Sequence, residues 1–361
     1  MADLKARIEK SLQHYFRSGH KICAMLVTDL FNVRYLSGFT GTNAQLILTP
    51  KKRCILTDSR YISQVQKQCP DFERVVYEKG LVETVAKVAD ELSCKNLGFE
   101  GHHVTFELHK KLSEGLENCE WVNVGENATK IRMVKDEEEV KKLKKAASIA
   151  ARGFLAVKSK IVPGAKESNV AMELEFAMRQ AGGEGLSFET IVASGSRSAL
   201  PHGVASEKKI EEGDLVVFDY GAMSEGYHSD ETITFTVGQP SARQKEIFQI
   251  VWDAQRKAID AVRPGVKCAD VDRITRDTIA EKGYGKLFGH GTGHGVGLEI
   301  HEEPRVSWVS QDILEEGMVV TVEPGIYIEG WGGVRIEDMV LVTARGAEIL
   351  TRLEKSSLEL K

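Results

Sequence analysis

Two strand–turn–strand segments carry pairs of acids inside apolar runs, and this pattern limits what the chain can fold into. In the first segment Asp219 ends the run LVVF, and Asp230 lies beyond a turn around SEG. If the hairpin pivots directly after Ser224, the two aspartates face each other with Cβ atoms about 4.5–5.5 Å apart. Two carboxylates so placed repel, and burying them without a partner is costly. The pattern therefore favours a cation between them. The alternative is a register shifted by one residue, which turns one aspartate to solvent.

The second segment repeats the arrangement. Glu323 lies in VVTVEPGIY and Glu337 in GVRIEDM, with Gly330 of a glycine-rich turn at the midpoint. Pro324 restricts the preceding Glu323 to an extended backbone, which helps to fix its direction. Acids are uncommon in buried strands unless they are paired. Two such pairs therefore indicate a site and argue against coincidence.

Between the two segments lies a stretch rich in histidine and glycine, residues 289–302. It holds five glycines and three of the ten histidines of the chain, His290, His294 and His301. Histidine is the commonest metal ligand, and glycine lets the backbone approach a bound group closely. The alternative is a flexible glycine-rich loop with incidental histidines.

The combined donor set is four carboxylates with one or two imidazoles. Oxygen-rich ligation with a single nitrogen favours Mn²⁺, with Co²⁺ or Zn²⁺ possible. Four acids carry enough charge for two divalent ions bridged by hydroxide, an arrangement that generates a nucleophile at neutral pH. We therefore predict a site for two divalent metal ions.

A nucleotide-binding loop is the competing interpretation of the glycines. It fails because no three glycines in the stretch have the G-x-G-x-x-G spacing: His294, Val296, Leu298 or Ile300 falls at the third place. The preceding YGKLF is also a poor Rossmann strand.

Composition sets the remaining bounds. A chain of 361 residues favours two domains, and a net charge of −5 gives no attraction to nucleic acid or anionic membranes. No apolar run is long enough to span a bilayer, and MADLKARIEKSLQHYF is typical of an amphipathic helix, not of a signal peptide. We expect a cytoplasmic protein without nucleic-acid or membrane partners.

The six cysteines are scattered and form no C-x-x-C pair. This spacing predicts neither a disulfide framework nor a thiolate zinc site. We expect most of them to be buried small hydrophobic residues or surface thiols.

Element patterns predict two different domains. Residues 1–130 alternate strands and helices, which indicates an α/β domain around a largely buried sheet. Residues 131–361 begin with a long helix, with Asp136 as its N-cap and Pro163 just beyond its end. Strands and helices then follow without strict alternation, which is typical of an α+β domain with an antiparallel sheet. The predicted helices of the first domain cover 59–69, 80–92 and 106–116, after the N-terminal one.

The motifs also resemble a known superfamily. HGTGHGVGLEIHE, with DYGAMSEGYHSDETIT before it and TVEPGIY and GGVRIEDMVLV after it, is similar to the pita-bread metallopeptidases. These include methionine aminopeptidase, aminopeptidase P and prolidase. IVASGSRSALPHG resembles the aminopeptidase P/prolidase branch, and NVRYLSGFTGTNA and ILTDSRY resemble its N-terminal domain. The resemblance implies an α/β N-terminal domain plus an α+β C-terminal pita-bread (creatinase/aminopeptidase-like) catalytic domain.

The resemblance also implies roles for individual residues. His301 would hydrogen-bond the substrate carbonyl or the oxyanion, and His202 would contact substrate or leaving group. His290 would lie beside the site, and Arg335 would orient Glu337 or bind a substrate carboxylate. Five residues would bind metal, with Glu323 also the general base: Asp219, Asp230, His294, Glu323 and Glu337.

One departure from the branch is visible. Where the family usually has D-x-T-R-T, this chain has Asp230-Glu231-Thr232-Ile233-Thr234, with isoleucine in place of arginine. That arginine is not a metal ligand, so catalysis is not excluded. We expect a pocket-lining or structural role for His228.

The resemblance implies hydrolysis of an Xaa-Pro bond in proline-containing peptides. The main expectation is an Xaa-Pro aminopeptidase that acts on longer peptides, and the alternative is an Xaa-Pro dipeptidase (prolidase). A non-catalytic peptide-binding protein is a remote alternative, against which the five intact ligand positions argue. The family is commonly dimeric, so a homodimer is expected, with residues 1–130 serving oligomerisation and forming a wall of the substrate pocket.

Overall fold

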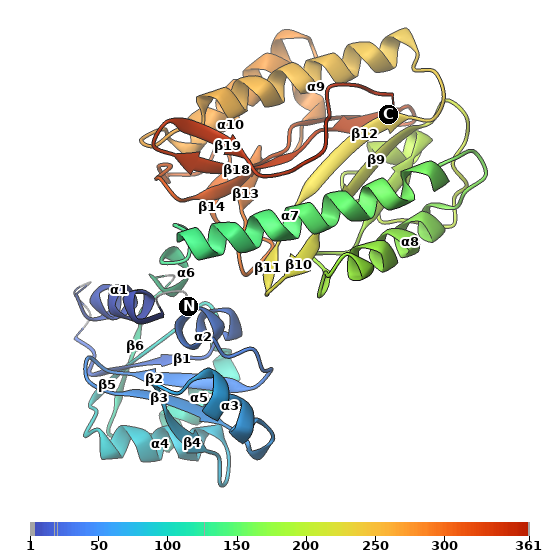
Figure 1. Ribbon diagram of the computed structural model, residues 1–361. Helices are drawn as coiled ribbons and strands as arrows, with labels where there is room; N and C mark the ends of the chain where they lie inside the picture. Colours follow the sequence, from blue (N-terminus) through green and yellow to red (C-terminus); the bar gives the residue numbers. More distant parts are fainter. Residues whose placement is uncertain (1–3, 18, 20, 126, 360–361) are drawn as a thin grey trace. The chain divides into compact units, whose positions relative to one another are not determined.

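A computed structural model of the chain describes residues 4–17, 19, 21–125 and 127–359 (Figure 1). The chain divides into two compact units, Met1–Arg132 and Met133–Lys361. Each unit has a sheet structure of its own and is considered separately below. Among the described residues, no helix combines the length and the apolar character needed to cross a membrane.

The first unit is built around a mixed sheet with strand order β4-β3-β2-β1-β5-β6. Strands β1, β5 and β6 run parallel, whereas β1, β2 and β3 pair in antiparallel fashion. The expected helices are confirmed. A further one, α2, follows the N-cap Asp29, whose side chain accepts from the Phe31 N–H. The strands are β1 Ala24–Val27, β2 Ala44–Leu48, β3 Arg53–Thr57, β4 Glu73–Val76, β5 Asn96–Phe99 and β6 Glu120–Asn123. The helices are α1 Leu4–Arg17, α2 Leu30–Ser37, α3 Ile62–Gln68, α4 Leu81–Glu91, α5 Phe106–Gly115 and α6 Asn127–Lys130.

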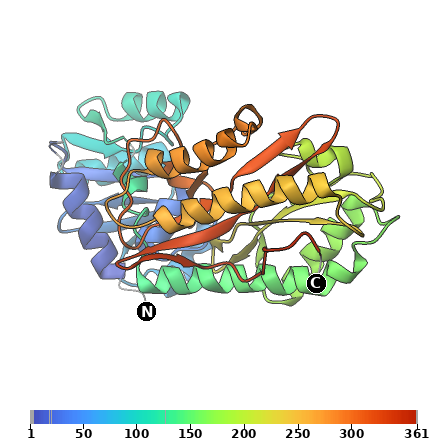
Figure 2. The same cartoon turned by 90° about the horizontal axis from the view of Figure 1, so that it is seen from above.

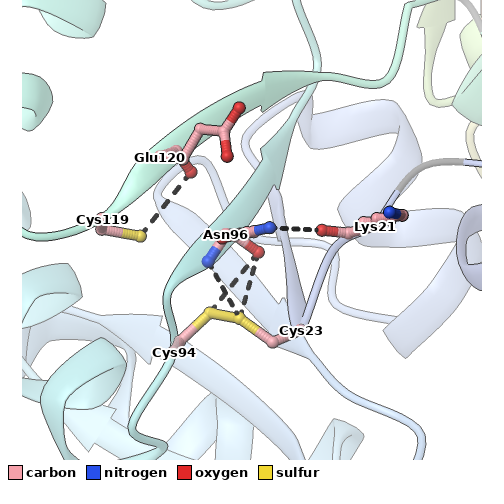
Figure 3. Close-up of a disulfide and its surroundings, with 6 residues drawn as sticks. All are labelled: Lys21, Cys23, Cys94, Asn96, Cys119 and Glu120. Carbon is pink, nitrogen blue, oxygen red and sulfur yellow. Dashed lines mark hydrogen bonds between the residues drawn. A yellow bond between two sulfur atoms is a disulfide. The ribbon is translucent and has the colours of Figure 1, made fainter.

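A disulfide joins Cys23 to Cys94 in this unit (Figure 3). The sequence predicted no disulfide framework and mostly free thiols, so this pair was missed, whereas the other four cysteines are free. Cys23 directly precedes β1 and Cys94 lies two residues before β5. Because these strands pair in parallel, their starts lie at the same edge of the sheet. The disulfide joins cysteines that are 71 positions apart, so the spacing of cysteines along the sequence does not reveal it.

In the second unit, helices cover two sides of the strands. Figure 1 shows α7 and α8 on one side and α9 and α10 on the other, and Figure 2 shows α9 and α10 lying over the strands. The N-cap of α7 is Asp136, as predicted, and its side chain forms a capping box with Glu139. The helix ends at Val157, ahead of the predicted Pro163, because a short 3₁₀ turn follows it. The helices are α7 Glu137–Val157, α8 Glu167–Gln180, α9 Ala242–Ala261 and α10 Cys268–Glu281.

The strands of this unit belong to several small sheets, and the strand pairs that the structure describes here are antiparallel, as expected. Apolar side chains of α7 and α8 pack on β8, β9 and β12, and those of α9 and α10 pack on β15 and β18. The strands are β7 Gly185–Leu186, β8 Ile191–Ser194, β9 Leu215–Tyr220, β10 Ala222–Ser224, β11 Tyr227–His228, β12 Glu231–Thr236, β13 Gly293–Gly295, β14 Glu302–Val306, β15 Val319–Val322, β16 Gly325–Ile328, β17 Gly332–Arg335, β18 Asp338–Thr343 and β19 Gly346–Ile349.

The register of the first acid-bearing hairpin differs from the prediction. Asp219 lies opposite Thr232, not opposite Asp230. The cause is the turn, where Glu225 and Gly226 both have positive φ, of 50° and 73°. A two-residue turn of this kind moves the pivot one residue along the chain and the pairing by two. Since side chains alternate with period two, Asp219 and Asp230 stay on one face, as diagonal neighbours.

The register of the second hairpin is confirmed. Tyr327 of β16 pairs with Gly333 of β17, and Val322 of β15 pairs with Asp338 of β18, so both strand pairs are centred on Gly330. A break in the pairing separates β15 from β16 and β17 from β18. Glu323 and Glu337 lie at corresponding positions of that break. This hairpin therefore presents its two glutamates as the sequence predicted.

The disulfide leads to a stability prediction. Replacing Cys94 with Ser should lower the free energy of unfolding of the first unit by about 2–4 kcal/mol, because the crosslink closes a long loop. Urea denaturation without reductant measures this difference, and excess reductant should abolish it. Cys119→Ser is the matched control, since Cys119 is a free thiol of the same unit. Separate Cys23 and Cys94 peptides in a non-reduced digest would contradict the pairing.

Candidate metal centre

Strand ends of the second unit bring the predicted ligands together. Donor atoms of Asp230, His294 and Glu337 all lie within 4.8 Å of one another. Glu323 joins this group, because its Oε1 lies 3.5 Å from His294 Nε2, the same distance that separates Asp230 Oδ2 from that nitrogen. Asp219 is the diagonal neighbour of Asp230 and is buried with it. The five side chains come from β9, β13 and the residues flanking β12, β15 and β18.

Hydrogen bonding orients the imidazole of His294. Its Nδ1 lies 3.0 Å from the carbonyl oxygen of Gly295, which can only accept, so Nδ1 carries the proton. In the neutral ring Nε2 is then the acceptor, and it faces the carboxylates of Asp230 and Glu323. A lone pair aimed at two carboxylates is unfavourable unless a cation lies between them. This tautomer is the one that a metal ligand needs.

Burial dominates the electrostatics of the acids. Desolvation raises the pKa of Asp230 well above its ordinary value, and the neighbouring Asp219 and Glu323 raise it further. Desolvation also raises the pKa of Glu337 well above the usual range, with Asp230 as the next cause. Asp219 shows a raised pKa from burial despite the opposing charge of Arg335. In the metal-free protein these groups therefore resist ionising together.

Arg335 binds Asp219, and its link to Glu337, the residue it was expected to orient, runs through Thr232. The guanidinium is buried, and its Nη2 donates to Asp219 Oδ2 at 2.6 Å. Its Nε donates to Thr232 Oγ1, which in turn donates to Glu337 Oε2 at 2.6 Å. Arg335 thus reaches Glu337 only through Thr232. The donors of Arg335 are buried and already bonded within the protein. They therefore do not support the other expectation, that Arg335 binds a substrate carboxylate.

His290 lies beside the ligands, with both ring nitrogens occupied. Nδ1 lies 2.8 Å from the Gly291 carbonyl, and Nε2 lies 3.0 Å from the hydroxyl of Tyr327. The Tyr327 oxygen also accepts from Arg335 Nη1 at 2.9 Å. Burial lowers the pKa of His290, which favours a neutral ring that accepts from the tyrosine. These contacts leave His290 no nitrogen for a metal and suit a supporting position.

His301 and His202 are the exposed members of the predicted set. The ring of His301 lies against that of His294, with centroids 4.4 Å apart. Partial burial, followed by the neighbouring His294, lowers the pKa of His301, and the charge of His202 contributes in the same direction. The His202 loop is tied to the centre because Arg335 Nη1 donates to the Pro201 carbonyl at 3.0 Å. The ring of His301 therefore lies beside the metal centre, and His202 belongs to a loop fixed to the arginine of that centre.

The isoleucine that replaces the family arginine faces away from the centre. Ile233 is buried in the apolar cluster that includes Phe154 and Phe218. Thr232 and Thr234 flank it and point the other way, toward Glu337 and Arg335. Alternation along β12 thus places this departure in the core. His228 is half-buried, and its backbone N–H donates to the Gly297 carbonyl.

Several residues that shape the centre were missed in the sequence. Thr232 bridges Arg335 and Glu337, and Tyr327 bridges Arg335 and His290. Asp272 of α10 accepts from the N–H and hydroxyl of Thr292 within the His/Gly stretch. Arg305 of β14 lies directly opposite His294. Of these residues, only Arg305 could have been found from the sequence, because it lies four residues after His301. The others lie far from the motif or are residue types common in any strand.

The residues present fit divalent cations. Asp219 Oδ1 is buried and has no hydrogen-bond partner among the described residues, although Oδ2 of the same carboxylate is bound by Arg335. With Nε2 of His294 and three further acids, it forms an oxygen-rich set with one nitrogen donor. Such a set suits hard or borderline divalent ions. The donors therefore match the kind of ion that the sequence predicted.

Comparison with known proteins follows the division of the chain. Residues 141–344 match metallopeptidase family M24, and residues 7–134 match the creatinase/prolidase N-terminal domain. The chain is 40% identical to an Xaa-Pro dipeptidase of Pyrococcus horikoshii over 357 residues, 98% of each protein. These matches confirm the predicted fold class, an α/β domain followed by an α+β pita-bread domain.

Two solved structures are similar over nearly the whole chain. An Xaa-Pro dipeptidase from Bacillus anthracis has a TM-score of 0.96 at 44% identity and covers 99% of this chain and 100% of its own. An X-Pro aminopeptidase from Thermotoga maritima has a TM-score of 0.88 at 40% identity and covers 93% and 97%. Each contains the fold of both units.

The raised pKa values of the acids predict a pH effect in the metal-free protein. A carboxyl whose pKa is higher in the folded than in the unfolded state adds stability below its ordinary pKa, near 4, and loses it as the pH rises through the folded-state value. Asp230→Asn removes one such group. The variant should therefore gain stability over wild type as the pH rises from 4, with a limiting slope of about 1.4 kcal/mol per pH unit.

Urea denaturation in excess chelator at a series of pH values measures this difference. Because the variant and wild type are compared at the same pH, the contributions of all other titrating groups to the free energy of unfolding cancel to first order. A difference that does not change with pH would contradict the raised pKa of Asp230.

Proposed function

Because the chain belongs to metallopeptidase family M24, we propose that it is an Xaa-Pro dipeptidase, a prolidase, that uses two divalent metal ions. The observation that carries this proposal is the convergence of four acids and Nε2 of His294 on one centre. Asp219, Asp230, His294, Glu323 and Glu337 would hold the ions, of which Mn²⁺ is the best match to the donors.

The chemistry follows from the positions of the side chains. When bound, the ions would polarise the scissile carbonyl and supply an activated water. Glu323 is the acid best placed as general base, because it is the most exposed of the four and would pass a proton to the proline nitrogen. His301, with its lowered pKa, would donate a hydrogen bond to the developing oxyanion. His202 would contact the leaving group.

Arg305 supports a dipeptide as substrate. It lies directly opposite His294 across β13 and β14, so both side chains leave the sheet on one face. Its side chain is 76% exposed and lies 3.7 Å from Glu303. In an Xaa-Pro dipeptide the free carboxylate lies on the residue next to the scissile bond, where an arginine on this face would bind it. The similarity to the Xaa-Pro dipeptidases points the same way.

Xaa-Pro aminopeptidase activity on longer peptides, the main expectation from the sequence, is the second candidate. The Thermotoga maritima X-Pro aminopeptidase, at 40% identity, is the observation in its favour. The homodimer, the cytoplasmic location and the role of the first unit as a pocket wall stay predictions.

Two substitutions should separate metal binding from catalysis. Chelation should abolish peptidase activity, and Mn²⁺ or Co²⁺ should restore it. Asp230→Ala should lose both metal and activity. His301→Ala should keep its metal while kcat falls about 100-fold, because it lacks a donor to the oxyanion. Metal analysis with Ala-Pro kinetics tests this, and His102→Ala, an exposed histidine of the first unit, is the control. Full activity of Asp230→Ala would contradict the ligand assignment.

The substrate length distinguishes the two activities. We expect Ala-Pro to be hydrolysed much faster than Ala-Pro-Ala. Arg305→Gln should raise KM for Ala-Pro roughly 10- to 100-fold, the value of a hydrogen bond to a charged group. Arg345→Gln, an exposed arginine elsewhere in the second unit, should leave KM unchanged. Faster turnover of the tripeptide would favour the aminopeptidase.

A further inference from the structure

A buried charged cluster lies behind the metal centre and has no part in the chemistry above. The ammonium of Lys355 forms ion pairs with Glu231 and with Asp338, the latter at 2.6 Å from Nζ to Oδ1. The three residues are 3%, 0% and 5% exposed. A buried ion pair tends to stabilise no more than apolar packing would, so its presence here calls for another explanation.

The cluster is joined to the metal ligands along the chain. Glu231 directly follows Asp230, and Asp338 directly follows Glu337. Side chains of neighbouring residues in a strand point to opposite faces. The ligands therefore face the metal centre while their neighbours face Lys355. Tyr220, which follows the ligand Asp219, also belongs to the cluster and donates to Glu231 Oε2 at 3.4 Å.

Other donors complete the cluster around the two acids. Asp338 accepts from Thr351 Oγ1 and, at 2.8 Å, from Gln255 Nε2 of α9. Glu231 accepts from the backbone N–H of Leu353 at 3.4 Å. Thr351, Leu353 and Lys355 all belong to the C-terminal segment, residues 350–358. The acids are thus held mainly by that segment.

Backbone hydrogen bonds fix the C-terminal segment to the same strands. The Leu350 N–H donates to the Met339 carbonyl of β18, and the Thr236 N–H of β12 donates to the Leu358 carbonyl, both at 2.8 Å. The segment therefore crosses from β18 to β12, with Lys355 between. It links the two strands that carry Glu337 and Asp230 at their starts.

We propose that Lys355 is a positioning residue of the metal centre: it fixes Asp230 and Glu337 through the acids that follow them, so that docking of the C-terminal segment and binding of divalent cations are linked. This inference rests on the ligand assignment of the proposed function. By reciprocity, a segment that improves cation binding must itself be stabilised when the cation binds.

A positioning role and a purely electrostatic role of Lys355 predict opposite effects of its removal on the affinity for cations. If Lys355 acted only through its charge, its removal would make the centre more negative and strengthen cation binding. If it positions the ligands, its removal leaves Glu231 and Asp338 without a counter-ion, shifts the strands and weakens binding. Loss of a group that supports metal ligands typically costs about 10- to 100-fold in affinity.

Titration of the metal-free protein with Mn²⁺, followed by calorimetry at a temperature where every variant is folded, tests the proposal. Lys355→Met should bind Mn²⁺ about 10- to 100-fold more weakly. Lys355→Arg, which keeps the charge and the donors, should bind more tightly than Lys355→Met. The matched control is Arg352→Met, an exposed cation three residues earlier on the same segment, which should bind as wild type does.

A double variant separates charge from position. Glu231→Gln combined with Lys355→Met keeps the net charge of the cluster but removes the ion pair. It should bind Mn²⁺ as weakly as Lys355→Met. Recovery of wild-type affinity in the double variant, or unchanged or tighter binding by Lys355→Met, would overturn the proposal.

Hydrogen exchange on the wild-type protein tests the linkage without any variant. Mn²⁺ should slow exchange of the Leu350 and Leu353 amides more than that of α8 amides. Equal protection of both regions would overturn the proposal even if Lys355→Met does not fold. If wild type and Asp230→Ala bind Mn²⁺ equally, or neither binds it, the ligand assignment fails, which is distinct from failure at Lys355 alone.

Discussion

Four carboxylates lie close together in the second unit, three of them buried, and their mutual repulsion is the constraint around which this part of the chain is arranged. Ionising all of them without cations is unfavourable, as the raised pKa values of Asp230 and Glu337 indicate. Arg335 neutralises one face of Asp219, and the remaining negative charge is left for divalent ions. The repulsion between these carboxylates, which is unfavourable without cations, would therefore favour the binding of divalent ions.

The period of two in a β-strand distributes charge to both faces of the same strands. On β12 one face carries the threonines that contact Glu337 and Arg335, and the other carries Glu231 and Ile233. Each face holds one buried cation, Arg335 or Lys355. The metal centre and the cluster behind it are thus one arrangement of alternating side chains. A substitution on either face of these strands would therefore shift the backbone that carries the side chains of both faces.

Substrate choice depends on groups outside the ligand set. The ligands are compatible with cleavage of a dipeptide or of a longer chain, since both place the same bond at the metals. In the proposed function Arg305, on the face of His294, would distinguish the two by the charge it offers to a free carboxylate.

The sequence by itself determined most of the elements, the acid pair of the second hairpin and the residue types around the centre, because period-two alternation and the glycine-centred turn are local. The second hairpin confirms this, since its register was predicted from Gly330 alone. The sequence analysis missed helix α2 and the two-residue turn that sets the register of the first hairpin. Only the tertiary structure decided which distant groups meet. The Cys23–Cys94 disulfide needs the parallel pairing of β1 with β5, Arg335 finds Asp219 through the packing of separate hairpins, and Lys355 reaches Glu231 from 124 residues away. Such contacts leave no pattern along the chain, because their spacing is fixed by how strands pair and not by the period of any one strand.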